Sequence, residues 1–207
     1  HLSPSGHPYR PDDDHPLTYW QQMEIAVREL LIEKGVTTAQ EINAQIDTMD
    51  ARTPANGAVV VARAWTDPDF RAALLEDASV ATREMGFDIG PMRLIALENT
   101  PDVHNIVVCT LCSCYPRNLL GLPPDWYKSR AYRSRTVKEP RKVLAEFGVT
   151  LPTTTTVRVH DSTADMRYVV IPQRPSGTDD WTAEALQDLV TRDSMIGTGQ
   201  AKLPNAR

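Results

Sequence analysis

All three cysteines of this 207-residue chain, Cys109, Cys112 and Cys114, lie within six consecutive residues. Two valines precede them and Tyr115-Pro116 follows. This pattern predicts a short buried strand that runs into a tight loop. Whatever path such a loop takes, its thiols must converge on one small volume. The chemistry of the protein is therefore expected here.

Three interpretations of the loop compete. Free cysteines are often buried as small apolar residues, but three of three in one short window disfavour this interpretation. A disulfide with one thiol left over is disfavoured because Cys112 and Cys114 are too close in sequence for an unstrained bridge. The third interpretation is a site for a soft metal ion, which thiolates suit.

The ligand count argues against common metal sites. Structural zinc takes four ligands, and the common iron–sulfur clusters take four cysteines. The nearest imidazole is His104, five residues before Cys109. The backbone nitrogens of Ser113 and Cys114 lie between the sulfurs and could bind a strongly Lewis-acidic trivalent ion. The spacing permits this ligand set but does not require it.

The segment Val108-Cys-Thr-Leu-Cys-Ser-Cys-Tyr-Pro116 resembles the metal-binding loop of nitrile hydratase alpha subunits. It is closely similar to the loop of the metal-bearing gamma subunit of thiocyanate hydrolase. Other segments resemble this family in the same order, from about residue 23 to residue 197. They are Gly121-Leu-Pro-Pro-Asp-Trp-Tyr-Lys128, Tyr132-Arg-Ser-Arg135, Glu139-Pro-Arg141, Met166-Arg-Tyr-Val-Val-Ile-Pro172, Gly177-Thr-Asp179 and Ser194-Met-Ile-Gly197.

The resemblance implies a non-corrin cobalt(III) or a non-haem iron(III) centre. Its ligands would be the sulfurs of Cys109, Cys112 and Cys114 and the backbone nitrogens of Ser113 and Cys114, with one exchangeable position. In the family, the residues that match Cys112 and Cys114 are oxidised to sulfinic and sulfenic acid. Thr110 resembles the cobalt type, so cobalt is expected.

The implied activity is hydration of a small nitrile to an amide. The oxidised oxygen on Cys114 would act as nucleophile or base, and the Ser113 hydroxyl would position water or substrate. In the family, arginines of a beta-type partner subunit support the oxidised cysteines. The chain is therefore expected to be inactive alone, and to depend on a maturation or activator protein for metal insertion.

Arg117 departs from the hydratase pattern. Nitrile hydratases commonly have tryptophan at this position, whereas Tyr115-Pro116-Arg117 matches thiocyanate hydrolase, and residues 86–93 lack the glutamine of many family members. A cation here suits thiocyanate or a polar nitrile, although an arginine turned outward toward a partner is an alternative. The segment that starts at Gly121 is closer to the hydratase version. We therefore expect a nitrile hydratase, with thiocyanate hydrolase as the alternative and a thiolate metal store or sensor as the non-enzyme alternative.

Composition narrows the class of partner. The net charge is −5, with 41% hydrophobic and 24% charged residues, which is typical of a globular chain and disfavours a nucleic-acid partner. No apolar run reaches the length of a membrane span, and no secretion signal is recognisable. Reduced thiols available for metal suit the cytoplasm.

Periodicity predicts helices early in the chain and strands later, which indicates an α+β fold with an N-terminal helical arm and a layered α/β domain. We expect a flexible tail over residues 1–16, the arm over 17–56, and the metal-binding catalytic domain over 57–207. The predicted elements are arm helices over 17–35 and 38–49, helices over 58–65, 67–75, 78–85, 139–147 and 181–192, and strands over 93–99, 104–109, 155–160 and 167–172.

Several residues outside the loop have weaker interpretations. Four arginines are candidates for supporting the loop or a subunit contact: Arg133, Arg135, Arg141 and Arg167. Trp126 and Tyr127 are expected to be core or interface aromatics. His160 beside Asp161 resembles a catalytic pair, but without a nucleophile it is expected to be structural.

Overall fold

The computed structural model describes residues 16–204, and the chain divides into two compact units, His1–Asp47 and Thr48–Arg207. The tail predicted over residues 1–16 lies outside the described residues, apart from Pro16. Within residues 16–204, no helix combines the length and the apolar character needed to span a membrane.

The first unit contains α1 (Tyr19–Glu33) and most of α2 (Ala39–Asp50). Thr18 begins α1 because its hydroxyl accepts from the Gln21 backbone N–H while the Gln21 side chain accepts from the Thr18 N–H, an arrangement that satisfies two free amides at the helix start. The predicted arm helices are thus confirmed. Their apolar stripe is exposed in this chain and includes Tyr19, Trp20, Met23, Val27, Leu30, Leu31, Ile46 and Met49.

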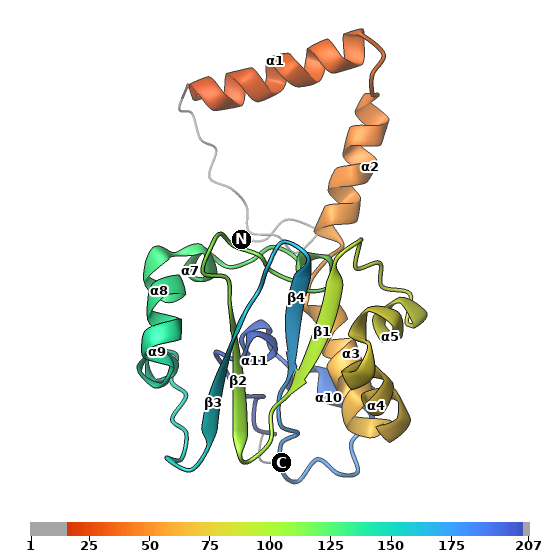
Figure 1. Ribbon diagram of the computed structural model, residues 1–207. Helices are drawn as coiled ribbons and strands as arrows, with labels where there is room; N and C mark the ends of the chain where they lie inside the picture. Colours follow the sequence, from red (N-terminus) through yellow and green to blue (C-terminus); the bar gives the residue numbers. More distant parts are fainter. Residues whose placement is uncertain (1–15, 205–207) are drawn as a thin grey trace. The chain divides into compact units, whose positions relative to one another are not determined.

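The second unit is built from short helices around four strands (Figure 1). Its strands are β1 (Arg93–Glu98), β2 (Val103–Val108), β3 (Thr156–Asp161) and β4 (Met166–Ile171). Its helices are α3 (Pro54–Thr66), α4 (Pro68–Glu76), α5 (Ala78–Glu84), α6 (Arg117–Leu120), α7 (Asp125–Lys128), α8 (Arg130–Lys138), α9 (Pro140–Glu146), α10 (Ala183–Gln187) and α11 (Arg192–Ile196).

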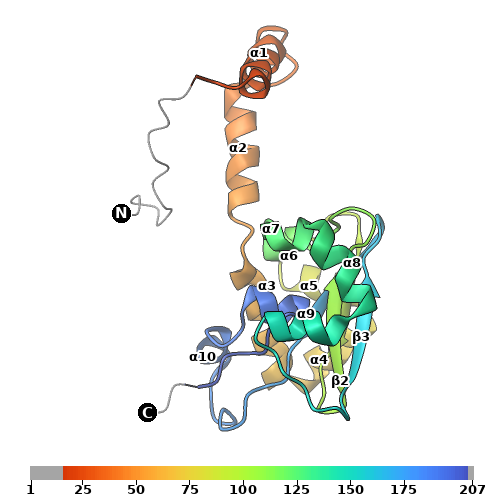
Figure 2. The same cartoon turned by 90° about the vertical axis from the view of Figure 1, so that its left-hand side faces the viewer.

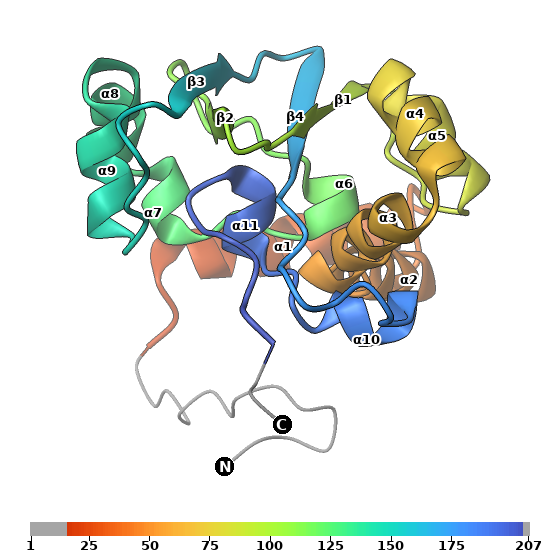
Figure 3. The same cartoon turned by 90° about the horizontal axis from the view of Figure 1, so that it is seen from below.

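The strands form two parallel ladders, β1 with β4 and β2 with β3. The ladders lie side by side, with β2 next to β4 (Figure 3). The register pairs Val108 at the end of β2 with Asp161 at the end of β3. Because parallel strands end at the same edge, residues that follow β2 meet residues that end β3.

Helices lie at both edges of this strand layer and over one of its faces (Figure 3). The helices α4 and α5 pack against β1, whereas α8 packs against β2 and α9 against β3 (Figures 1 and 2). The helix α11 packs on β4 and buries Met195 and Ile196 completely. Burial of these faces stabilises the layer at about 25 cal/mol for each Å² of apolar surface.

The mixed helix and strand class, the layered domain and the four predicted strands are confirmed. The single helix predicted over residues 181–192 is wrong, because the chain forms α10 and α11 instead. Thr191 is extended, and its side chain caps the Ser194 N–H to start a new helix, so one continuous helix is interrupted. The expected boundary between residues 56 and 57 falls inside α3, while the compact units divide after Asp47.

Candidate metal centre

The three cysteine sulfurs converge at the end of β2. The Sγ atoms of Cys109 and Cys112 are 3.5 Å apart, those of Cys112 and Cys114 are 3.3 Å apart, and all three lie within 4.8 Å of one another. All three cysteines are free, since the spacings exceed the ~2.05 Å of a disulfide bond. The predicted convergence is confirmed, and the disulfide alternative is wrong.

The loop backbone turns its amides toward the sulfurs. The Cys112 N–H donates to Cys109 Sγ at 3.3 Å, and the backbone amides of Ser113 and Cys114 help to lower the pKa of the Cys112 thiol. Cys109 is buried, whereas Cys112 and Ser113 are exposed. The two main-chain nitrogens named by the resemblance therefore lie beside the thiol cluster.

Asp161 holds the start of the loop. Its carboxylate accepts from the Thr110 backbone N–H at 2.9 Å and from the Thr110 hydroxyl at 2.5 Å. The Ser162 N–H donates to the Val108 carbonyl at 2.7 Å. Hydrogen bonds to an ionised carboxylate are stronger than those between neutral groups, so Asp161 fixes the chain as it leaves β2.

Two tyrosines from α7 and α8 hold the loop at both ends. The Tyr127 hydroxyl donates to the Cys114 carbonyl at 2.7 Å, and the Tyr132 hydroxyl donates to the Val107 carbonyl at 2.7 Å. Both rings are buried and pack with Trp126, whose ring centroid is 4.9 Å from that of Tyr132. Burial raises the pKa of both tyrosines, so each stays protonated and able to donate.

Two of the four candidate arginines contact the loop. Arg167 Nε donates to the Tyr115 carbonyl at 3.2 Å, and Arg133 Nη1 to the Thr110 carbonyl at 3.4 Å. Arg135 instead pairs with Glu139 and Glu146, and Arg141 donates to carbonyls at residues 151, 152 and 155.

The thiols differ in acidity. Hydrogen bonds from the Cys114 and Cys109 thiols lower the pKa of Cys112 to about 7. Burial, followed by the neighbouring Cys112 thiolate, raises the pKa of Cys114 to about 12, against the opposing charge of Arg167. Between these two, Cys112 loses its proton first, and a bound cation would be needed to deprotonate Cys114 at neutral pH.

Comparison with known proteins identifies the family. The family model described as nitrile hydratase, alpha chain, matches residues 18–199. The chain belongs to this family. The family is one of hydro-lyases, so the chain is an enzyme subunit.

The similar proteins include subunits of both enzymes that the sequence resembles, nitrile hydratase and thiocyanate hydrolase. The chain is 50% identical to the low-molecular weight cobalt-containing nitrile hydratase subunit alpha of Rhodococcus rhodochrous, over 87% of this chain and 88% of the relative. It is 42% identical to the thiocyanate hydrolase subunit gamma of Thiobacillus thioparus, over 87% of this chain and 79% of the relative. A solved structure of a double mutant of the iron-type nitrile hydratase from Comamonas testosteroni Ni1 matches with a TM-score of 0.84 and 40% identity, covering 93% and 95% of the two chains.

The other candidate site residues lie on the exposed side of the loop. Ser113 is exposed, and Arg117 is exposed at the first position of α6, with no carboxylate in ion-pair range among residues 16–204. The imidazoles do not join the cluster. His104 is buried in β2 with Nε2 on the Gly197 carbonyl, and His160 Nε2 contacts Asn105 Oδ1. The structural interpretation of His160 therefore agrees with its contacts.

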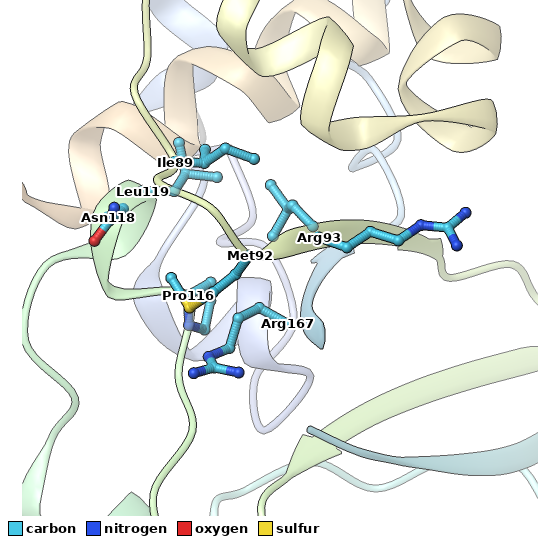
Figure 4. Close-up of a pocket in the computed structure, with 8 residues that line it drawn as sticks. Ile89, Met92, Arg93, Pro116, Asn118, Leu119 and Arg167 are labelled. Atoms are coloured by element: carbon cyan, nitrogen blue, oxygen red, sulfur yellow. The ribbon is translucent and has the colours of Figure 1, made fainter. Parts of the chain in front are cut away.

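A small apolar cavity lies beside the exit of the loop. Its walls come from the segment before β1, from the start of β1, from α6 and from β4, and include Pro116 and Arg167 (Figure 4). Its volume of about 10 Å³ is close to the minimum for one water molecule. This cavity is too small for a nitrile.

The donor set fits a soft or borderline transition-metal ion. Three sulfurs converge on one point, and the amides of Ser113 and Cys114 lie beside them. Thiolates favour such ions over hard cations such as magnesium.

The sequence did not reveal three residues that hold the loop. Asp161 lies 51 residues from its partner Thr110, Tyr127 lies 13 residues from Cys114, and Tyr132 lies 25 residues from Val107.

Proposed function

We propose that this chain is the metal-bearing alpha-type subunit of a nitrile hydratase, with non-corrin cobalt(III) as its cofactor. The observation that carries the proposal is the convergence of three free thiols within 4.8 Å on a loop held from both ends. Family membership and cobalt-containing relatives support it. Iron(III) is the second choice of metal, since a similar solved structure is iron-type.

The proposed ligands are the sulfurs of Cys109, Cys112 and Cys114 with the backbone nitrogens of Ser113 and Cys114. When bound, cobalt(III) supplies a Lewis acid for the carbon–nitrogen triple bond. We propose further that Cys112 is oxidised to the sulfinic acid and Cys114 to the sulfenic acid. Cys112 is the exposed member of the group and has the lowered pKa, which suits oxidation.

Each proposed catalytic group has one role. The sulfenic oxygen of Cys114 would act either as the nucleophile toward the nitrile carbon or as the base that takes a proton from the water attacking that carbon. The Ser113 hydroxyl is exposed and orients the water or the substrate. Arg117 supplies a positive charge near the loop exit, which favours substrates with hydrogen-bond acceptors.

The remaining assignments concern the setting. A beta-type subunit would supply arginines that pair with the anionic cysteine oxygens, and the exposure of Cys112 and Ser113 leaves room for it. A maturation or activator protein would load the metal. The reduced, free thiols of the chain suit assembly in the cytoplasm.

Thiocyanate hydrolysis is the second candidate function. It is favoured by Arg117 and by the 42% identity to a thiocyanate hydrolase gamma subunit. The non-enzyme alternative, a metal store or sensor, is disfavoured because the family is one of enzymes.

The test is a substrate assay on the chain purified with its beta-type partner. Benzonitrile, a nucleoside nitrile and thiocyanate are supplied separately. We expect amide from at least one nitrile. Carbonyl sulfide and ammonia from thiocyanate, with no amide from either nitrile, would replace the first candidate function with the second.

A further inference from the structure

The helix α6, which begins three residues after Cys114, is a single turn of four residues. The N–H groups of Leu119 and Leu120 donate to the Pro116 carbonyl. The Gly121 N–H donates to the carbonyl of Arg117 at 2.9 Å. A lone turn of this length is unstable in water, because helix nucleation is unfavourable. Contacts with other parts of the chain must therefore hold α6 and, with it, its first residue.

Apolar packing holds the inner side of α6. The side chains of Leu119 and Leu120 are buried. Gly57 of α3 lies so close to α6 that a Cβ at residue 57 would be 2.3 Å from Leu120 Cδ2. Apolar attraction is non-directional, whereas hydrogen bonds require a defined geometry. The direction of the exposed side of α6 therefore depends on its polar contacts.

Arg52 holds the polar side of α6 at two points. It follows the end of α2 and lies 66 residues from Asn118 in the sequence, yet its Nη1 atom donates to Asn118 Oδ1 at 3.1 Å. Its backbone carbonyl lies against Gly121, where a Cβ would be 2.3 Å from the Arg52 oxygen. Gly121 also has a φ of 73°, which glycine adopts without strain. Arg52 thus contacts α6 in its middle and at its end.

The Asn118 amide lies between Arg52 and the segment before β1. A guanidinium has donors only, so the amide oxygen faces Arg52 and the amide nitrogen is free to face the other side. There a Cβ on Gly90 would be 2.7 Å from Asn118 Nδ2. The Gly90 carbonyl is itself held by Arg83 Nη2 at 2.9 Å. Asn118 and Ile89 line the same small cavity (Figure 4).

We propose that Asn118 is a positioning residue, which fixes α6 through Arg52 and so sets the direction of Arg117. The bond from Arg52 is half-buried and has an ionised donor, which makes it stronger than a bond between neutral groups. Arg117 makes no ion pair within residues 16–204, so its direction follows from that of α6. The inference rests on the proposed function, in which Arg117 acts on the substrate.

Hydrogen exchange followed by mass spectrometry measures the opening of α6 independently of activity. The sample is the chain purified with its beta-type partner. In Asn118→Ala, the amides of residues 119–121 should exchange about tenfold faster, because the turn loses a hydrogen bond from a charged donor. Arg52→Met keeps an unbranched side chain without donors and should have the same effect. Asn118→Asp keeps the acceptor, so exchange should stay within about twofold of that of the unsubstituted chain.

The double variant Arg52→Met, Asn118→Ala distinguishes one shared contact from two independent contacts. Its amides should exchange no faster than those of the single variants, within about twofold. The control is Asn56→Ala, because Asn56 is also half-buried in a helix but its side chain forms no hydrogen bond within residues 16–204. Unchanged exchange in the single variants, multiplied effects in the double variant, or equal acceleration in the control would overturn the inference.

Steady-state kinetics tests the link to Arg117. For each of benzonitrile, the nucleoside nitrile and thiocyanate that the complex converts, Asn118→Ala should raise KM about threefold and leave kcat within about twofold. Asn118→Asp should restore KM. A general loss of folded protein would lower kcat instead. An unchanged KM in an active complex would overturn the positioning role. If the unsubstituted complex converts none of the three, the proposed function is wrong, and the exchange rates still decide whether Asn118 fixes α6.

Discussion

At the scale of single residues, Asp161 has a role that its position in the sequence hides. Its carboxylate accepts hydrogen bonds from the backbone N–H and the hydroxyl of Thr110. Thr110 directly follows the buried Cys109. The register of β2 and β3 places it there, since Val108 pairs with Asp161. We regard Asp161 as a positioning residue for the ligand loop, because it contacts no sulfur.

The substitution Asp161→Asn should lower both cobalt occupancy and kcat/KM. The amide keeps the size of the carboxylate but loses the charge that strengthens both hydrogen bonds, and we expect about a tenfold decrease in kcat/KM (about 1.4 kcal/mol). Asp102→Asn is the control, since Asp102 is exposed in the turn before β2. Cobalt per chain and initial rates are measured for both. Unchanged values for Asp161→Asn would exclude the positioning role.

We propose that Arg117 makes the site favour substrates with a negative charge. Arg117→Gln removes the cation while keeping a hydrogen-bond donor, so activity toward anionic thiocyanate should decrease more than activity toward benzonitrile. We expect the ratio of the two kcat/KM values to change by about fivefold, because one ion pair contributes about 1 kcal/mol. If the ratio stays constant, Arg117 does not set specificity.

At the scale of elements, α7 and α8 support the loop through their aromatic residues. The ring of Trp126 makes edge-to-face contacts with the rings of Tyr127, Tyr132 and Phe147, and Phe147 lies at the C-terminal end of α9. From this cluster the two tyrosine hydroxyls reach the carbonyls of Val107 and Cys114. The helices thus hold the main chain on both sides of the sulfurs.

Tyr127→Phe should destabilise the chain by about 1 kcal/mol, since the Cys114 carbonyl loses its donor while the packed ring is kept. Urea unfolding measures the change. Tyr168→Phe is the control, because the Tyr168 ring packs on His160 and is only partly buried. In the cobalt-loaded protein, the sulfur-to-cobalt absorption bands should also shift in Tyr127→Phe alone. Equal effects in the two variants would contradict a specific role for Tyr127.

The part of the site that was predictable from the sequence is the part that is local. Cys109, Cys112 and Cys114 share one loop, so their convergence required no knowledge of the fold. Asp161 and Tyr132 reach the loop only through strand pairing and helix packing, which short-range patterns do not show. The prediction of one helix over residues 181–192 was wrong for a local reason. The apolar spacing continues through Thr191, but the Thr191 side chain caps the start of a new helix.

At the scale of the whole molecule, buried tyrosine hydroxyls make the free energy of unfolding depend on pH in the alkaline range. Burial raises the pKa of Tyr115, Tyr127 and Tyr132 above the ordinary value. Above pH ~10 the unfolded chain releases these protons while the folded chain keeps them. The contribution of these tyrosines to the free energy of unfolding is therefore fully present below pH ~10, and it decreases as the pH rises above that value.

The expected result is one alkaline transition seen by two probes. Phenolate absorbance at 295 nm should show these tyrosines ionising together with the loss of the circular dichroism signal, at a pH above the ordinary tyrosine pKa of ~10. Reversible ionisation of all tyrosines near pH ~10 in a folded chain would contradict their burial.

The proposed activity depends on three sulfurs and two main-chain nitrogens of one loop that together hold cobalt(III). Cobalt K-edge X-ray absorption of the purified complex tests this ligand set most directly. We predict a trivalent edge and a first shell in which sulfur atoms of Cys109, Cys112 and Cys114 accompany nitrogen. A first shell of nitrogen and oxygen without sulfur would contradict it.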